Sequence, residues 1–355
     1  MPQIKIISAD HFQIPLPVVL TDATHGEMSE FDIITVRIRD ADGDEGLGYT
    51  YCVDRGAADS IKSLVARGLN PLINGEDANR IEYLWQKMWW GLHYTGRGGS
   101  LSFAISAVDI ALWDLKAKKL GVPLWHLLGG HNPKVRAYAG GIDLLFPLEQ
   151  LLEQTRRHLD NGFQAIKMKV GRPNISEDIS RVAAMRKELG DDFPLMVDAN
   201  MGWRPDQAIS AAKALSPFAL TWLEEPTIPD DFAGFGRIQR EGGIPIAAGE
   251  NFHTLYEFQH LMDAAGVSFP EPDVANCGGI SVMDSSSVTL ENVIIMDNFA
   301  QDKAGGILIE NSDATFDNVS IMNNTALTGG GVHVRDSSSV TLDNVSITSN
   351  HAEDE

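Results

Sequence analysis

The middle of the chain contains short apolar runs that each end in a carboxylate and are separated by segments with helical periodicity. The acids Asp198, Glu224 and Glu250 close the runs LMVDAN, TWLEEP and IPIAAGE. Alternation of this kind predicts buried parallel strands joined by right-handed helical crossovers. In a parallel (β/α) barrel the carboxyl ends of the strands meet at one rim, where functional groups gather. We therefore expect the three acids to converge, and three convergent carboxylates favour a hard divalent cation.

Two lysines precede this series on an earlier apolar run. In AIKMKVG, Lys167 and Lys169 stand two residues apart, so the alternation of a strand directs both side chains to one face. The apolar residues around them favour a buried strand over an exposed edge with both amines in solvent. A lysine beside a divalent cation is suited to remove a proton next to a carboxylate.

Strand and helix segments alternate from Arg136 to Ile280. The strand candidates are VRAYAGG, AIKMKVG, LMVDAN, TWLEEP, IPIAAGE and FPEPDVAN, and the helices should begin near Leu148, Ser176, Pro205, Asp231 and Thr254. A closed barrel has eight strands and about 250 residues. The prediction for residues 131–280 is therefore an α/β fold, a truncated (β/α) barrel with about six of the eight strands.

The residues before the barrel are typical of an α+β domain, predicted over 1–130. Residues 3–54 alternate in the manner of strands and contain the turn sequence ADGDEG. From Ala57 to about Leu128 the apolar spacing is helical, and Gly121-Val122-Pro123 ends the longest helical stretch.

A different pattern begins near Gly278 and predicts a third region, 281–355. Two asparagine landmarks recur every 26 residues, the first at Asn292, Asn318 and Asn344 and the second at Asn298, Asn324 and Asn350. Short β-branched runs divided by Gly, Ser, Asp and Asn indicate a right-handed parallel β-helix with one repeat per coil. Fewer than three coils fit into this length. The Asn and Asp residues of these repeats are expected to form ladders and turns, and the alternative role of the acids is to bind Ca²⁺.

The charge and composition of the chain exclude some classes of binding partner. The formal charge is −21, and residues 281–355 hold 12 acidic against 2 basic residues. A charge of this sign argues against nucleic acid or an anionic membrane surface as a partner. Two cysteines are too few for a disulfide framework, and we find neither an export signal nor a long apolar stretch. We therefore expect a cytoplasmic protein.

Residues 1–280 resemble the mandelate racemase subgroup of the enolase superfamily. The resemblance is carried by SFAISAVDIALWDLKAKKLGVPLWHLLGG, AIKMKVG, LMVDAN, TWLEEPTIPDD, AAGENFHTLYEF and EPDVANCGGI. It implies that residues 1–130 form a capping domain over the barrel. Within the subgroup, TDATHGEMSEFDIIT, LHYTGRGG and GGIDLLFPLEQLL are most like cycloisomerases of sugar acids. A sugar-acid substrate and a homo-oligomer are then expected.

The resemblance also assigns roles to residues. It implies three Mg²⁺ ligands, namely Asp198, Glu224 and Glu250. Asn200 would contact the substrate or a water on the metal. Lys169 would take the proton α to the carboxylate, while Lys167 would neutralise that carboxylate and lower the pKa of its neighbour. Loss of the β-oxygen then gives a 2-keto-3-deoxy acid.

In such enzymes Asp273 would orient a histidine on the seventh strand. In this chain the pattern of a β-helix begins where that strand is expected. The barrel motif NCGGI and the tail motifs AGGI and GGGV share a Gly-Gly-aliphatic step at Gly278, Gly279 and Ile280. We interpret the chain as a chimera joined at that step, with turnover close to background. The alternative is a non-catalytic fragment with a β-helical surface or adhesive tail.

Substrate selection in this family depends on loops of the capping domain. The candidates here are His25, His93, Tyr94 and Arg97. Ordinary surface or hydrogen-bonded polar residues are an equally open interpretation of these four.

Overall fold

The computed structural model describes residues 2–53, 56–130, 132 and 134–279, and within 287–352 the strands given below with residues 345, 349 and 350. The chain forms two compact units, residues 1–121 with 135–280 and residues 122–134 with 281–355. The domain boundaries at 130 and 280 stay predictions.

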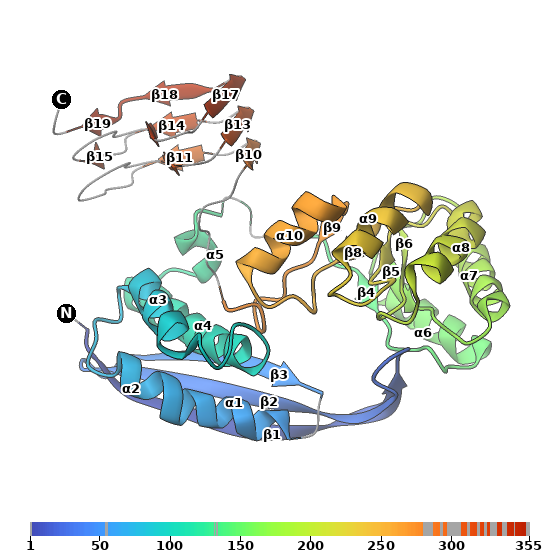
Figure 1. Cartoon of the computed structure of the whole chain (residues 1–355), viewed down its shortest axis with the longest axis horizontal. Coiled ribbons are helices and arrows are strands. Elements are labelled where there is room, and N and C mark those ends of the chain that lie inside the picture. Colours follow the sequence, from blue (N-terminus) through green and yellow to red (C-terminus); the bar gives the residue numbers. More distant parts are fainter. Residues whose placement is uncertain are drawn as a thin grey trace. The chain divides into compact units, whose positions relative to one another are not determined.

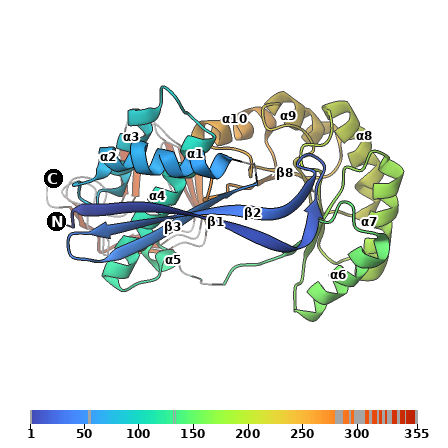
Figure 2. The same cartoon turned by 90° about the horizontal axis from the view of Figure 1, so that it is seen from below.

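Among the described residues, an antiparallel sheet of three strands opens the first unit, in the region whose alternation predicted strands. Its strands are β1 (Ile4–Thr21), β2 (Glu27–Asp40) and β3 (Glu45–Cys52), in that order. Ile34, Val36 and Ile38 alternate along β2 and are fully buried. The helices that follow are α1 (Ala57–Ser63), η1 (Leu64–Leu69), α2 (Asn70–Ile73), α3 (Ile81–Leu92) and α4 (Ser100–Leu120). Together they bury an apolar core against the sheet (Figure 2).

Two glycines set the distance between β3 and α4. A Cβ atom on Gly46 would lie 2.0 Å from the carbonyl oxygen of Ala111, and one on Gly48 would lie 2.0 Å from that of Ala107. The helix backbone therefore rests directly on the strand, and only glycine fits at these two positions.

Among the described residues, the parallel sheet of the first unit has six strands, the number that was predicted. They are β4 (Ala139–Gly140), β5 (Ile166–Lys169), β6 (Leu195–Asp198), β7 (Leu223–Glu224), β8 (Ile246–Ala248) and β9 (Phe269–Pro270). Their order in the sheet is their order in the chain, as in part of a (β/α) barrel.

Helices alternate with these strands and cover the outer face of the sheet (Figure 1). They are α6 (Leu148–Asp160), α7 (Ile175–Leu189), α8 (Pro205–Leu215) with the short turn η2 (Ser216–Phe218), α9 (Phe232–Glu241) and α10 (Leu255–Ala265). Each begins within one residue of the predicted position. Asn174, Asp231 and Thr254 cap three of them by accepting a backbone N–H with the side chain.

The second unit contains α5 (Leu124–Leu127) and short parallel strands. One stack comprises β10 (Ser287–Glu291), β13 (Asp313–Asp317) and β17 (Ser339–Asp343), and another comprises β11 (Ile294–Met296), β14 (Ser320–Met322) and β18 (Ser346–Thr348). The remaining pairs are β12 (Ile307–Glu310) with β16 (Val332–Arg335) and β15 (Thr325–Ala326) with β19 (His351–Ala352).

The register of these strands follows the predicted repeat of 26 residues. Ser287 pairs with Asp313, which pairs with Ser339, so equivalent positions stack at the expected spacing. Asn350 donates its side-chain N–H to the carbonyl oxygen of Ile321 in the preceding coil, at 2.9 Å. The other landmarks, Asn292, Asn298, Asn318, Asn324 and Asn344, lie outside the described residues.

Within the described part of the chain, we find no helix with the length and apolar character needed to cross a bilayer.

Replacing Gly48 with valine should destabilise the first unit by about 2 kcal/mol or more, because the new side chain meets helix backbone that cannot move aside. The measurement is the thermal unfolding midpoint by circular dichroism. Gly140→Ala is the control, since a Cβ there meets only a ring carbon of Tyr138 at 3.8 Å. Equal midpoints for the two variants would contradict the packing described.

Candidate active site and metal centre

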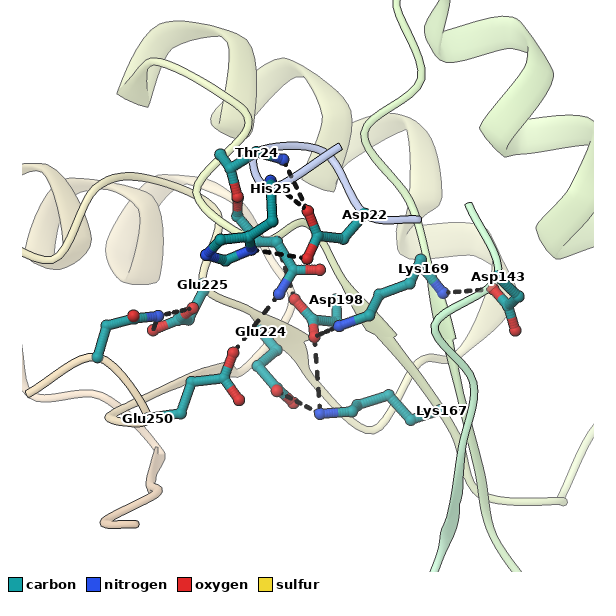
Figure 3. Close-up of polar contacts among 12 residues, drawn as sticks. Asp22, Thr24, His25, Asp143, Lys167, Lys169, Asp198, Glu224, Glu225 and Glu250 are labelled. Atoms are coloured by element: carbon teal, nitrogen blue, oxygen red, sulfur yellow. Dashed lines mark hydrogen bonds and ion pairs between the residues drawn. The ribbon is translucent and has the colours of Figure 1, made fainter. Parts of the chain in front are cut away.

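Strand register brings the predicted lysines and acids together. Lys169 pairs with Asp198 across β5 and β6, and Asp198 pairs with Glu224 across β6 and β7. The Nζ of Lys169 lies 2.5 Å from Oδ2 of Asp198, and Lys167 donates to Oε1 of Glu224. Both lysine side chains leave β5 in the same direction, as the alternation of the strand required (Figure 3). All four groups are buried.

The third acid completes a set of carboxylates. One oxygen from each of Asp198, Glu224 and Glu250 lies within 4.8 Å of the others. Glu250 follows β8 and is partly exposed, so the set opens toward solvent on that side. A donor set made entirely of carboxylate oxygens matches the preference of Mg²⁺ and Ca²⁺.

Asn200 lies beside these acids. Its backbone N–H donates to Oδ1 of Asp198 at 2.8 Å, and its side-chain nitrogen is 3.5 Å from Oε1 of Glu250. Its own Oδ1 is buried and has no partner among the described atoms. The residue holds φ at 38°, a conformation that asparagine tolerates. A buried oxygen without a partner next to three carboxylates fits a cation or its water, so these residues suit the predicted metal.

Burial and the crowding of negative charge raise the pKa of two acids in the site. Burial, followed by the charge of Asp198, raises the pKa of Glu224 to about 8 although Lys167 acts against the shift. Burial and the charge of Glu250 raise the pKa of Glu225 well above its ordinary value. A divalent cation would relieve both effects.

Lys167 was expected to lower the pKa of Lys169, but Asp198 raises this pKa by more. Burial and the positive charge of Lys167 do lower the pKa of Lys169, but the attraction and hydrogen bond of Asp198 are stronger, so the pKa lies above its ordinary value. Without a cation to engage Asp198, Lys169 is therefore an ammonium. Sequence reasoning missed this because it weighed the lysine pair and left out the acid on the next strand.

Asp273 is bound to the N-terminal sheet. The hydroxyl of Tyr51 on β3 donates to Oδ2 of Asp273 at 2.9 Å, and the backbone N–H of Ala275 donates to Oδ1 at 2.9 Å. Among the described residues, no histidine bonds to Asp273. Tyr51 was not predicted, because its partner lies far away in the sequence.

His25 lines a cavity of about 490 Å³ between the sheet and the barrel strands. Lys169, Asn200, Glu250 and Tyr51 line the same cavity. The predicted residues His93, Tyr94 and Arg97 do not line it. His93 contacts the carbonyl oxygen of Trp90 at 2.9 Å, and Tyr94 is 94% exposed, so their part in binding stays a prediction.

Two further acids escaped the sequence analysis. Asp22 accepts hydrogen bonds from the loop that carries His25. Glu271 has a buried oxygen without a partner among the described atoms, and burial raises its pKa to about 7. The signal for Glu271 was present in the sequence, because Glu271 directly follows β9 and stands two residues before Asp273.

These observations define a metal-assisted enzyme built on a partial (β/α) barrel, and the chain belongs to the enolase superfamily. Residues 5–129 match the family model of the mandelate racemase / muconate lactonizing enzyme N-terminal domain, and residues 150–286 match the enolase C-terminal domain-like model. Residues 259–353 match the right handed beta helix region, as the repeats predicted.

Individual relatives cover most of the chain. The 3,6-anhydro-alpha-L-galactonate cycloisomerase of Streptomyces coelicolor is 53% identical over 301 residues, which are 84% of this chain and 83% of the relative. The L-talarate/galactarate dehydratase of Salmonella typhimurium is 38% identical, over 76% of this chain and 68% of the relative.

Solved structures agree with the fold. A racemase from Streptomyces coelicolor, described with bound magnesium, has a TM-score of 0.76 at 56% identity and covers 78% of this chain and 77% of its own. The Salmonella typhimurium dehydratase, liganded with Mg and L-lyxarohydroxamate, has a TM-score of 0.74 at 37% identity, with 78% and 72% covered.

Mg²⁺ should raise the thermal unfolding midpoint, because a cation that binds only the folded chain stabilises it by about 2.7 kcal/mol at a hundredfold excess over its dissociation constant. Glu250→Gln should reduce this shift. Asp42→Asn is the matched control, since Asp40, Asp42 and Asp44 form another acidic group whose oxygens already lie 2.5, 2.9 and 3.0 Å from the ammonium of Lys119. A midpoint unchanged by Mg²⁺ would contradict an assembled site.

The same shift should grow with pH. Since the pKa of Glu224 is about 8, a proton competes with the cation for this carboxylate below that pH and ceases to compete above it. Unfolding midpoints with and without Mg²⁺ at about pH 6.5 and about pH 8.5 check the sign. A gain that is larger at the lower pH would exclude this competition.

Proposed function

We propose that the chain is a Mg²⁺-dependent enzyme that removes the proton α to the carboxylate of a sugar acid and eliminates the β-oxygen, which leaves a 2-keto-3-deoxy acid. The observation that carries the proposal is the register of β5, β6 and β7. It sets two buried lysines against Asp198 and Glu224, and oxygens of these two acids and of Glu250 lie close enough together for one cation.

Each group has a distinct part in this reaction. Mg²⁺ held by Asp198, Glu224 and Glu250 would bind the substrate carboxylate and stabilise the negative charge that develops there. Lys167 pairs with the charge of that carboxylate. Lys169, as a neutral amine, takes the α-proton, and the C–H electron pair passes toward the carboxylate. Asn200 orients the substrate beside the acids.

The substrate class follows from the relatives. The extent and identity of the match to the 3,6-anhydro-alpha-L-galactonate cycloisomerase favour a substrate whose β-oxygen belongs to an anhydro ring. Elimination then opens the ring and no water leaves. The match to a dehydratase of talarate and galactarate favours a second substrate, an open-chain sugar diacid that loses water.

Turnover should be lower than in such relatives. In the described chain the parallel sheet ends at β9, and Asp273 accepts its hydrogen bond from Tyr51, where a histidine is expected in the family. This arrangement is also what favours the alternative, a non-catalytic chimera.

The test is exchange of the substrate α-hydrogen in deuterium oxide, followed by proton magnetic resonance with 3,6-anhydro-L-galactonate and with galactarate. We expect Mg²⁺-dependent loss of the α-proton signal from at least one of them, since abstraction needs only groups that are present. Lys169→Ala should remove the exchange by about 10²-fold or more. Exchange that is absent, or that persists in Lys169→Ala, would refute the assignment.

A further inference from the structure

We propose that His25, oriented by Asp22, donates the proton to the departing β-oxygen. This inference rests on the proposed function and supplies the acid that elimination needs. Removal of the α-proton alone leaves the β-oxygen bonded, and an alkoxide is a poor leaving group until it is protonated. The family's acid is a histidine paired with Asp273, but here that carboxylate accepts the Tyr51 hydroxyl.

The loop that carries His25 is clamped around one buried carboxylate. Oδ1 of Asp22 accepts the backbone N–H groups of Thr24 at 2.9 Å and of His25 at 2.7 Å. Oδ2 of Asp22 lies 2.8 Å from Nδ1 of the His25 ring. Asp22 is only 9% exposed. Three contacts to one carboxylate fix both the backbone and the ring of His25.

The loop that carries His25 also bonds to the backbone next to the proposed metal ligand Asp198. The hydroxyl of Thr24 donates to the carbonyl oxygen of Asn200 at 3.0 Å, two residues beyond Asp198. His25 therefore keeps a fixed position relative to the carboxylates. It lines the same cavity as Lys169, with the base coming from β5 and the histidine from the N-terminal sheet.

The Asp22 contact determines which ring nitrogen carries the reaction. Burial raises the pKa of Asp22, but the hydrogen bonds from the His25 ring and from two backbone N–H groups outweigh it, so the pKa lies below its ordinary value. An ionised carboxylate only accepts, so Nδ1 keeps its proton. The second ring nitrogen, Nε2, is then the one that gains and releases a proton, and Asp22 stabilises the imidazolium.

Lys169 accepts the α-proton, and the C–H pair enters the carboxylate as an enediolate. As the carboxylate re-forms, the pair moves into a new bond between the α and β carbons, and the β carbon–oxygen bond breaks with its electrons on oxygen. Imidazolium Nε2–H protonates that oxygen. The resulting enol takes up a proton at the β carbon and releases its hydroxyl proton to solvent, which gives the 2-keto-3-deoxy acid. Lysine and histidine return to their initial states through solvent.

The experiment compares two rates in the same sample of full-length chain with Mg²⁺, namely α-hydrogen exchange in deuterium oxide and formation of the 2-keto-3-deoxy product. In His25→Gln we expect product formation to fall by about 10²-fold while exchange stays within about twofold. Asp22→Asn should also lower the rate of product formation relative to the rate of exchange. His11→Gln is the matched control, because His11 pairs with Asp32 at 2.7 Å elsewhere on the same sheet and should leave both rates unchanged.

Each outcome decides the question. Unchanged product formation in His25→Gln overturns the inference, and so does an equal loss of both rates, which marks a structural role. An unaltered chain that exchanges without elimination also overturns it while leaving proton abstraction intact. An unaltered chain that does neither overturns the proposed function and this inference with it.

Discussion

The buried ion pairs between the β5 lysines and the acids of β6 and β7 are the interactions on which the rest of the centre depends. Lys169 and Asp198 lie 2.5 Å apart, with little or no exposure of either side chain. Removing one partner of such a pair leaves an uncompensated buried charge, at a cost of about 3–5 kcal/mol. The carboxylates outnumber the ammonium groups, and burial together with the charge of Asp198 raises the pKa of Glu224 to about 8. The same excess of buried negative charge makes the centre a place for a divalent cation.

Contacts from the N-terminal sheet and its helices complete the cavity. Thr24 bonds to the backbone of Asn200 and Tyr51 to Asp273, so the loop after β1 and the strand β3 fix residues just beyond β6 and β9. The segment after β9 is held in the same way, because Gly278 accepts from Trp85 at 2.5 Å and donates to the Ser106 hydroxyl at 2.7 Å. Contacts with the N-terminal helices thus continue up to Gly278, and the junction at the glycine pair stays a prediction.

The strands, helix starts and converging acids could be predicted because their signals are local. Apolar runs, capping residues and a two-residue lysine spacing are fixed by neighbours in sequence, and strand register then aligns Lys169, Asp198 and Glu224. The Tyr51–Asp273 bond and the Thr24–Asn200 contact join residues more than a hundred positions apart, and no local pattern reports them. The pKa of Lys169 was misjudged for the same reason, since the acid that raises it belongs to another strand.

The central claim is that acids from three strands share one cation. It is tested most directly by an anomalous difference map from crystals of the chain soaked in Mn²⁺, which occupies oxygen sites of this type. We expect one strong peak within bonding distance of carboxylate oxygens from Asp198, Glu224 and Glu250. A map with no peak there, or with the cation bound only at the exposed Asp42 and Asp44 hairpin, would contradict it.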